Sequence, residues 1–296
     1  MTDTTATSAP EKILLGLIGK GIQQSMTPAM HEEEGRRQGL RVHYQLIDMA
    51  VTGAGIEDLP ALVKSMRIIG FNGFNVTFPC KQAIIPFLDD LSEEARAMGA
   101  VNTVVNRDGK LIGHNTDGSG WSWGFKRALP DADLSKVVLL GGGGAGSAIA
   151  DAALRMGVKH LTVVDLDVAR TRLLVDKLNV QHGAGRASAS ADIAAALKDA
   201  NGLIHATPTG MDKLPGLPLP AELLRADLWV SEVVYFPLET ALLKTARALG
   251  CPTSDGGGMA VGQAIGAFEL FTGLKADVAR IDAHFRSMVE ARTAKA

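Results

Sequence analysis

The chain has 296 residues, of which 46% are hydrophobic and 21% charged, and this profile fits a soluble globular α/β protein with two ordinary domains. A formal net charge of −2 gives no general reason to bind nucleic acid or an anionic membrane surface. Cys80 and Cys251 form no spacing motif for a metal or a disulfide, which fits a reducing compartment. Residues 1–10 lack a signal-peptide core, and polar residues and glycines interrupt the most apolar stretch, residues 137–157. We therefore expect a cytoplasmic protein without a membrane span.

The first 110 residues alternate strand-like and helix-like segments, as a mostly parallel sheet requires. Residues 13–18 predict a buried strand, and Thr27-Pro28 predicts a helix start, with Glu32–Glu34 in the early turns where they suit the helix dipole. Further strands are predicted at 43–47, 73–77 and 100–105, and helices at 59–66 and 86–98. Residues 107–110 predict a hairpin turn that leads into residues 111–113.

The remainder of the chain begins with a predicted helix at 121–129 that connects two halves. A strand at 137–140, a glycine loop, a helix at 148–156 and a strand at 160–165 then form one βαβ unit. Further helices are predicted at 169–178, 192–198, 238–248 and 260–271, and strands at 202–206 and 228–234. We expect a substrate-binding α/β domain of residues 1–117, completed by 256–296, and a Rossmann-type dinucleotide-binding domain of residues 118–255.

The glycine loop carries the first chemical signal. Gly141, Gly143 and Gly146 fit the pattern G-x-G-x-x-G between a predicted strand and a predicted helix, with Gly144 and Ala145 between them. Such a loop allows a tight turn and close approach of the backbone to a pyrophosphate, which the helix N-terminus then binds. Glycine-rich turns also arise for steric reasons alone, but the strand before the loop favours a dinucleotide site.

Asp165 closes the next predicted strand. Its carboxylate can accept hydrogen bonds from ribose hydroxyls and repel a 2′-phosphate, by about 1 kcal/mol in water and roughly 4 kcal/mol at a protein surface. No basic residue directly follows it, and the first is Arg170, which we also place beside the cofactor. NAD is therefore favoured over NADP. Asp165 could instead cap the helix near Ala169, and a methyltransferase could carry a similar loop.

Five polar segments elsewhere are specific. They are Ser25-Met26-Thr27-Pro28, Asn75-Val76-Thr77-Phe78-Pro79-Cys80-Lys81, Gly99-Ala100-Val101-Asn102-Thr103-Val104, Gly113-His114-Asn115-Thr116-Asp117, and the stretch from Asp255 to Gln263. Together they resemble the shikimate/quinate dehydrogenase family over residues 13–285, and residues 206–211 and 234–237 also look like family segments.

The resemblance implies that Lys81 and Asp117 are the catalytic pair. A neutral Lys81 would accept the proton of the reacting hydroxyl during oxidation, while hydride passes to a nicotinamide ring. Because a carboxylate at Asp117 favours the ammonium form of Lys81, we expect oxidation to accelerate toward alkaline pH. The alternative is a surface lysine and a turn aspartate without a catalytic role.

The resemblance also implies the binding residues. Ser25 and Thr27 would hold the substrate carboxylate, and threonine at the second place resembles the quinate-using members; Thr27 could also cap its helix. The other substrate-binding residues would be Asn75, Thr77, Asn102, Tyr235 and Gln263, together with the catalytic pair. The cofactor side would include Thr207, Met211, Val234, Gly256 and Met259, with Tyr235 near the nicotinamide as well.

Two residues depart from the family pattern. His205 stands where asparagine is usual, and Glu232 replaces the usual aspartate, which puts cofactor-side contacts of His205 in doubt. We interpret His205 as a packed or hydrogen-bonded neighbour and not as a catalyst. The remaining histidines show no grouping of metal ligands, so no metal is expected.

These observations favour a cytoplasmic monomer or homodimer that uses NAD to oxidise the 3-hydroxyl of quinate, and of shikimate, to the 3-keto acid, as quinate catabolism requires. One alternative is an NADP-dependent shikimate dehydrogenase of aromatic amino-acid biosynthesis, against which Thr27 and Asp165 argue. A more distant alternative is a non-catalytic dinucleotide-binding regulator, against which the intact polar segments argue.

Overall fold

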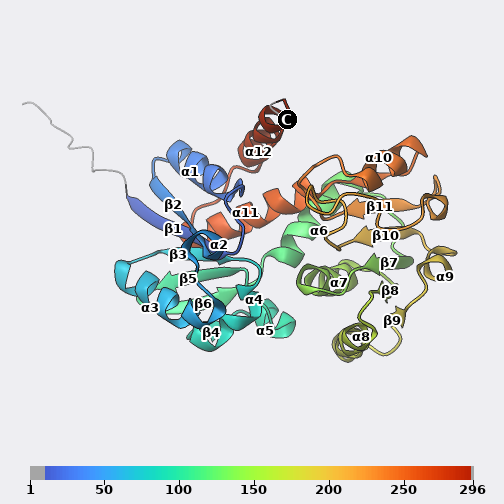
Figure 1. Cartoon of the computed structure of the whole chain (residues 1–296), viewed down its shortest axis with the longest axis horizontal. Coiled ribbons are helices and arrows are strands. Elements are labelled where there is room, and N and C mark those ends of the chain that lie inside the picture. The colour runs from blue at the N-terminus through green and yellow to red at the C-terminus, as the bar shows by residue number, and fades with distance from the viewer. Residues whose placement is uncertain (1–10, 295–296) are drawn as a thin grey trace, which may run out of the picture. The chain divides into compact units, whose positions relative to one another are not determined.

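The computed structural model describes residues 11–294 and divides into two compact units (Figure 1). The first unit contains the described residues up to His114 and the segment Ala267–His284, and the second contains Asn115–Gly266 and the described residues from Phe285 onward. The predicted polar tail, residues 1–10, lies outside the described residues. The observed divisions fall at other residues than the domain boundaries expected at 117 and 256, because most of one long helix packs within the second unit.

The first unit contains a six-stranded sheet in the order β2-β1-β3-β5-β6-β4. Its strands are β1 (Lys12–Gly19), β2 (Arg41–Asp48), β3 (Gly73–Val76), β4 (Asp90–Leu91), β5 (Thr103–Arg107) and β6 (Lys110–His114). The pairs β1–β2, β1–β3 and β4–β6 are parallel, whereas β3–β5 and β5–β6 are antiparallel. The predicted hairpin joins β5 to β6, and both of its turn residues, Asp108 and Gly109, have positive φ, as tight hairpin turns require.

The helices of the first unit depart from expectation at one place. They are α1 (Thr27–Arg37), α2 (Met49–Thr52), α3 (Leu59–Ile69), α4 (Cys80–Ala83) and α5 (Glu93–Met98). The single helix predicted over 86–98 is wrong, because a short 3₁₀ turn and strand β4 precede α5. The Ser92 hydroxyl accepts a hydrogen bond from the Ala95 N–H, so the helix starts only at Glu93. In α1 the glutamates Glu32–Glu34 lie in the second turn, among the early turns where they were expected.

The second unit contains a six-stranded sheet in the order β12-β11-β10-β7-β8-β9, in which every pair is parallel. Its strands are β7 (Lys136–Leu140), β8 (His160–Val164), β9 (Ala187–Ser190), β10 (Gly202–His205), β11 (Trp229–Glu232) and β12 (Thr253–Ser254). The chain runs outward from β7 through β8 to β9 and then returns to the other side of β7 with β10. The strand order therefore reverses between β7 and β10, which is where doubly wound sheets bind ligands.

The helices that accompany this sheet begin earlier than predicted where glycine is abundant. They are α6 (Asp117–Ala128), α7 (Gly144–Met156), α8 (Val168–His182), α9 (Ile193–Leu197), α10 (Ala241–Ala248) and α11 (Gly256–Thr272), and α12 (Val278–Thr293) follows. Helices α7 and α11 each start four residues before the prediction. Glycine weakens an isolated helix, so local propensity placed these residues in loops, and packing overrides that preference.

A close crossing of α6 and α11 explains the glycines of both helices. A Cβ built at Gly124 would lie 2.5 Å from the carbonyl carbon of Gly258, and one built at Gly262 would lie 2.5 Å from the carbonyl oxygen of Gly120. The two backbones are therefore in direct contact, and no larger residue fits at these positions without a backbone shift.

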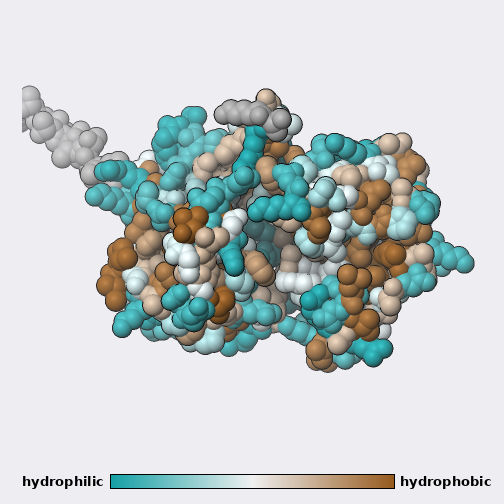
Figure 2. All heavy atoms as spheres, viewed as in Figure 1, coloured by the Kyte–Doolittle hydropathy of each residue, from teal (hydrophilic) through white to brown (hydrophobic). Residues whose placement is uncertain are grey.

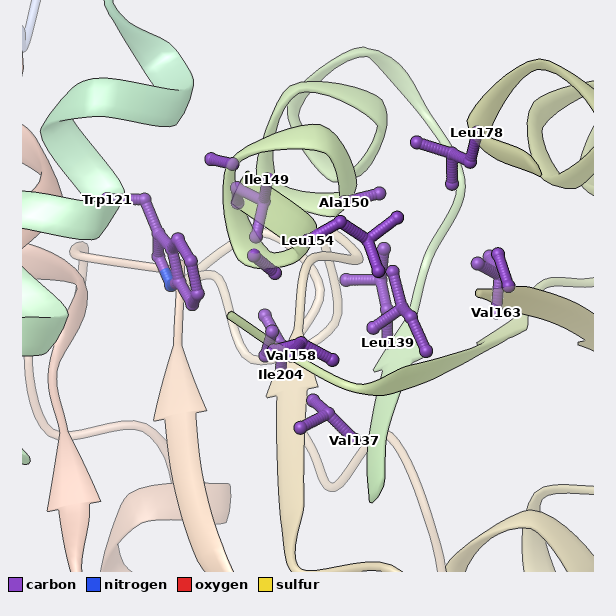
Figure 3. Close-up of a cluster of buried hydrophobic side chains, with 14 of the residues drawn as sticks. Trp121, Val137, Leu139, Ile149, Ala150, Leu154, Val158, Val163, Leu178 and Ile204 are labelled. Atoms are coloured by element: carbon purple, nitrogen blue, oxygen red, sulfur yellow. The ribbon is translucent and has the colours of Figure 1, made fainter. Parts of the chain in front are cut away.

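The core of the second unit lies between α7 and the sheet. Ile149, Ala150 and Leu154 of α7 belong to one cluster with Leu139 and Ile204 on the strands (Figure 3), and all five side chains are buried. The viewed face of each unit carries hydrophilic residues with hydrophobic ones interspersed (Figure 2), as protein surfaces ordinarily do. Within residues 11–294 no helix combines the length and apolarity that a bilayer span needs.

Candidate active site

The predicted dinucleotide loop has the required geometry in the second unit. Gly141 has φ of +106°, and a Cβ built there would lie 2.8 Å from the Ala206 carbonyl carbon. A Cβ at Gly146 would lie 1.9 Å from the Gly141 carbonyl oxygen, so only glycine allows α7 to start so close to the strand. Built Cβ atoms at Gly143 and Gly144 meet nothing within 4 Å, and no side chain caps the helix. The open N-terminus of α7 thus offers N–H groups and space that fit a pyrophosphate.

Asp165 follows β8 directly and is held by the loop itself. Its Oδ2 accepts a hydrogen bond of 2.7 Å from the Gly142 N–H, and its Oδ1 accepts bonds from the Asp167 N–H and from Arg170 Nη2 at 2.8 Å. Burial pushes the pKa of Asp165 up, but the two backbone donors and Arg170 outweigh it and lower this pKa. Asp165 does not cap α8: Asp167 does, by accepting from the Arg170 N–H.

The other residues expected on the cofactor side follow β10 and β11 or begin α11. Thr207 and Val234 lie just beyond the carboxyl ends of β10 and β11, and Met211 is 41% exposed in the loop after Thr207. Gly256 lies against the backbone of Val233 and Val234, and Met259 is buried in the core of the second unit. Both therefore have a packing role, and their contact with a cofactor stays a prediction.

Asp117 and Gln263 lie together, as the family segments suggested. Asp117 is the first residue of α6 and is buried, and its Oδ1 accepts a hydrogen bond of 3.0 Å from Gln263 Nε2 on α11. The Asp117 backbone N–H donates to Asn115 Oδ1 at 2.9 Å, which fixes the start of the helix. The glycine crossing brings these two side chains together. Tyr235, also of this unit, is partly exposed and lies 6.5 Å from the Phe285 ring centroid.

One edge of the first sheet gathers the remaining predicted residues. The parallel strands β1 and β3 end together, with Ile18 paired to Val76, and the antiparallel β5 begins at the same edge, with Thr103 paired to Asn75. Residues 25 and 27 follow β1, and residues 77 and 81 follow β3. The Lys81 carbonyl accepts from the Val101 N–H at 2.8 Å, so α4 is tied to the segment that carries Asn102.

Ser25 and Thr27 are both partly buried at this edge. The Ser25 hydroxyl accepts a hydrogen bond of 3.3 Å from the Thr27 N–H. Helix α1 begins at Thr27 with Met26 as N-cap and without a side-chain cap, so the alternative that Thr27 caps the helix is wrong. Lys81 belongs to the first unit and Asp117 to the second, and their catalytic pairing stays a prediction.

A hydrogen-bond network orients the amides at this edge, and sequence reasoning missed two of its members. The Tyr44 hydroxyl donates to Asn75 Oδ1 at 2.6 Å, and Asn75 Nδ2 donates to Thr103 Oγ1 and to the Asn102 carbonyl. The Thr103 hydroxyl in turn donates to Asn102 Oδ1 at 2.9 Å. Burial raises the pKa of Tyr44 well above its usual value, so its hydroxyl keeps its proton. Tyr44 and Thr103 thus determine how Asn75 and Asn102 point.

The two residues that depart from the family pattern, His205 and Glu232, are hydrogen-bonded to each other. His205 ends β10 and Glu232 ends β11, and the strand register pairs them. His205 Nδ1 lies 2.8 Å from Glu232 Oε1, and both side chains are fully buried. The prediction that His205 is a hydrogen-bonded neighbour is confirmed. Among the described residues, no three His, Cys, Asp or Glu side chains form a group able to hold a metal ion.

Comparison with known proteins agrees with the fold and the motifs. A family model described as the shikimate dehydrogenase substrate binding domain matches residues 17–104. A Streptomyces avermitilis protein named shikimate dehydrogenase (NADP(+)) is 55% identical over 273 residues, covering 92% of this chain and 94% of that protein. A Corynebacterium glutamicum protein named quinate/shikimate dehydrogenase (NAD(+)) is 47% identical over 283 residues, covering 94% and 99%.

Solved structures give the same answer. The structure of quinate dehydrogenase from Corynebacterium glutamicum in complex with NAD matches with a TM-score of 0.89 and 47% identity, over 94% of this chain and 99% of that one. The predicted two-domain α/β fold is confirmed by this match. The sequence identity to these relatives is well above 30% over nearly the whole length, which is enough to assign a family. The chain belongs to the family of shikimate and quinate dehydrogenases.

Proposed function

We propose that this chain is an NAD-dependent dehydrogenase that oxidises the 3-hydroxyl of quinate, and of shikimate, to a ketone, as a cytoplasmic monomer or homodimer. The first unit would bind the substrate and the second the dinucleotide. The observation that carries the choice of NAD is Asp165, whose carboxylate is fixed by the loop N–H of Gly142 at the end of β8. A fixed negative charge there disfavours the extra phosphate of NADP. The Corynebacterium glutamicum relatives named for NAD support the same choice.

The residues present fit a dinucleotide. The N–H groups at the open start of α7 would bind the pyrophosphate, Asp165 the adenosine ribose, and Thr207 would lie on the nicotinamide side. When bound, the nicotinamide ring supplies the hydride acceptor. The closed backbone packing of Gly141 against Ala206 gives these groups a rigid base.

In this proposal, the polar residues at the edge of the first sheet, where β1 and β3 end and β5 begins, bind the substrate. Ser25 and Thr27 would hold the carboxylate, and the oriented amides of Asn75 and Asn102 would bind ring hydroxyls. The Lys81 amine would take the proton of the reacting hydroxyl as general base, and its ammonium form would return that proton in the reverse direction. Asp117, held by Gln263, would bind and orient the reacting hydroxyl and the amine.

A second candidate is an NADP-dependent shikimate dehydrogenase. The Streptomyces avermitilis relative carries that name. Arg170 is half exposed and is bonded to Asp165 at 2.8 Å, so its guanidinium could turn to a 2′-phosphate and offset the carboxylate.

Steady-state kinetics with quinate and shikimate, each against NAD and NADP, tests the proposal. We expect kcat/KM with NAD to exceed that with NADP at least about tenfold, because even about 1.4 kcal/mol of repulsion gives that ratio. Much the highest kcat/KM with NADP and shikimate would contradict the assignment and support the second candidate.

The variant Asp165→Asn isolates the charge. It should lower the NAD-to-NADP ratio of kcat/KM about tenfold or more, since the side chain keeps its size but loses its negative charge. The matched control is Asp167→Asn, an exposed carboxylate two residues away at which asparagine still caps α8. The control should leave the ratio within about twofold.

A further inference from the structure

The buried pair of His205 and Glu232 has a definite hydrogen-bond order. Glu232 Oε1 accepts from the backbone N–H groups of Val233 and Val234 at 2.8 and 3.0 Å, and its Oε2 accepts from the Thr240 hydroxyl at 2.9 Å. These donors and His205 Nδ1 all converge on a carboxylate, which can only accept. The His205 Nδ1 atom must therefore carry a proton and donate.

This donor order also determines the role of Thr207, the third residue of the hydrogen-bonded series. With Nδ1 as the donor, Nε2 of the neutral imidazole is an acceptor. The Thr207 hydroxyl lies 2.5 Å from that nitrogen, so in this tautomer the hydroxyl is the donor. The Thr207 oxygen also accepts a longer bond of 3.3 Å from the Thr209 N–H. A buried carboxylate thus determines, through one imidazole ring, where the hydroxyl proton of a partly exposed threonine points.

Thr207 lies at the place where the strand order reverses. Strands β7 and β10 are neighbours, with Leu140 paired to His205, and the dinucleotide loop begins one residue after Leu140. A Cβ built at Gly141 would lie 3.0 Å from the Thr207 methyl carbon. The Thr207 side chain therefore has its methyl against the loop and its hydroxyl proton turned toward His205.

We propose that His205 and Glu232 are positioning residues for dinucleotide binding: they lock the Thr207 side chain in one rotamer, so that the one lone pair of its oxygen that Thr209 leaves open accepts a hydrogen bond from the bound dinucleotide. This inference rests on the proposed function, because it needs a dinucleotide at the loop. A threonine without this restraint has three χ1 positions, and rotation would remove the acceptor and carry the methyl away from Gly141. The pair thus reduces the ordering that binding would otherwise require.

A double-mutant cycle with binding as its readout tests the proposal. The dissociation constants of NAD and NADP are measured by titration calorimetry for wild type, His205→Asn, Thr207→Val and the double variant. Asparagine can still donate to Glu232 but is too short to reach Thr207. We expect His205→Asn to weaken binding of the preferred dinucleotide about fivefold, the worth of one hydrogen bond, in the wild-type background. In the Thr207→Val background it should have no effect, because nothing remains to be positioned.

Controls separate positioning from a general loss of stability. Thr207→Ser keeps the hydroxyl and should retain the dependence on His205. The variant His182→Asn removes a partly buried histidine–carboxylate hydrogen bond of the same unit, that between His182 Nε2 and Asp151 Oδ1 at 2.8 Å. It should lower the midpoint of thermal unfolding and leave the dissociation constant unchanged. If His205→Asn does not fold, His205→Gln takes its place in the cycle.

The outcomes distinguish two failures. An equal effect of His205→Asn in both Thr207 backgrounds, or no effect in either, would overturn the positioning role. If the wild type bound neither NAD nor NADP, the proposed function itself would fail.

Discussion

Both units place polar groups at one edge of a sheet, but different interactions hold those groups in position. In the first unit side chains orient one another, as Tyr44, Asn75 and Thr103 do. In the second unit, glycines allow close backbone contacts that set the positions of the polar groups. One buried histidine–glutamate pair is the exception, because there a side chain orients another side chain. A single substitution can change the orientation of the groups in a side-chain network, whereas a close backbone contact tolerates almost no substitution. Under the proposed function, this difference suits the first unit to selecting among substrates and the second to holding one invariant cofactor.

Substitution of Lys81 gives the strongest test of the roles proposed for the two units. The variant Lys81→Met removes the proposed general base, and we expect kcat to fall about 10²–10⁴-fold, the usual worth of such a group. The dissociation constant for NAD should stay within about twofold. Lys64→Met, at an exposed position of α3, serves as the control and should leave kcat unchanged. A dissociation constant that changed as much as kcat would contradict the assignment of Lys81 to the substrate side.

The rigidity of the second unit is tested at Gly124. In Gly124→Ala the new methyl would meet the backbone of Gly258 at 2.5 Å. Overpacking of this kind costs up to about 3 kcal/mol or more, which outweighs the gain of about 1 kcal/mol from alanine in a helix. We expect a net loss of about 2–3 kcal/mol in the free energy of unfolding, measured by urea titration.

The control for this crossing lies on the other helix, α11. A Cβ at Gly266 would meet the Thr116 side chain, its methyl carbon at 3.3 Å, and a side chain can yield where a backbone cannot. Gly266→Ala should therefore be close to neutral. Equal losses for both variants would show that the backbone contact is not the source of the effect.

The first unit carries an acid-sensitive residue in its core. His31 is buried beside Tyr44, Phe268 and Phe271, and within the described residues its Nε2 is a buried nitrogen without a hydrogen-bond partner. Burial lowers the pKa of His31 to about 4, and the bond to the Thr27 carbonyl offsets this only in part. Between pH 6.5 and 4 the unfolded chain binds a proton at this site that the folded chain does not. Stability is therefore lost as the pH falls through this range.

The variant His31→Gln removes this titration. Between pH 7 and pH 5 the wild type should lose about 2 kcal/mol more of its free energy of unfolding than the variant does. Denaturant titrations at both pH values measure the difference. Parallel losses in the two proteins would show that other groups carry the acid sensitivity.

The smallest expected effect concerns the hydroxyl of Tyr44. Tyr44→Phe removes the hydrogen bond to Asn75 Oδ1 and frees that amide to turn. A loss of about 1 kcal/mol corresponds to a rise of about fivefold in the KM for quinate or shikimate. The dissociation constant for NAD should not change. A larger effect on NAD than on the substrate would reverse the roles given to the two units.

Much of this architecture is predictable from the sequence. The strand before Gly141, the loop and Asp165 follow the spacing that is typical of a dinucleotide-binding βαβ unit, and the five polar segments identify the family. Side chains such as Asp117 and Gln263 can be assigned to one site because the segments that carry them are specific. Their contact at 3.0 Å agrees with that assignment.

What could not be predicted depends on tertiary contact. Strand β9 lies in an alanine-rich stretch and contains no β-branched or aromatic residue, so its pairing with β8 is what makes it a strand. Tyr44 is one aromatic residue of a strand, and its partner Asn75 is 31 positions away. Likewise, the bond between His205 and Glu232 depends on the register of β10 and β11, which the two isolated departures did not reveal.

The crossing of α6 and α11 has a consequence for how variants of this protein are judged. Asp117 and Gln263 project from two helix backbones in direct contact, so any backbone shift at the crossing moves these two side chains relative to each other. A natural or designed sequence could keep every polar residue of the site and still misalign this bond through one added methyl group at position 124 or 258. Enzyme engineering on this scaffold should therefore treat those glycines as part of the active-site specification, although they carry no functional group at all.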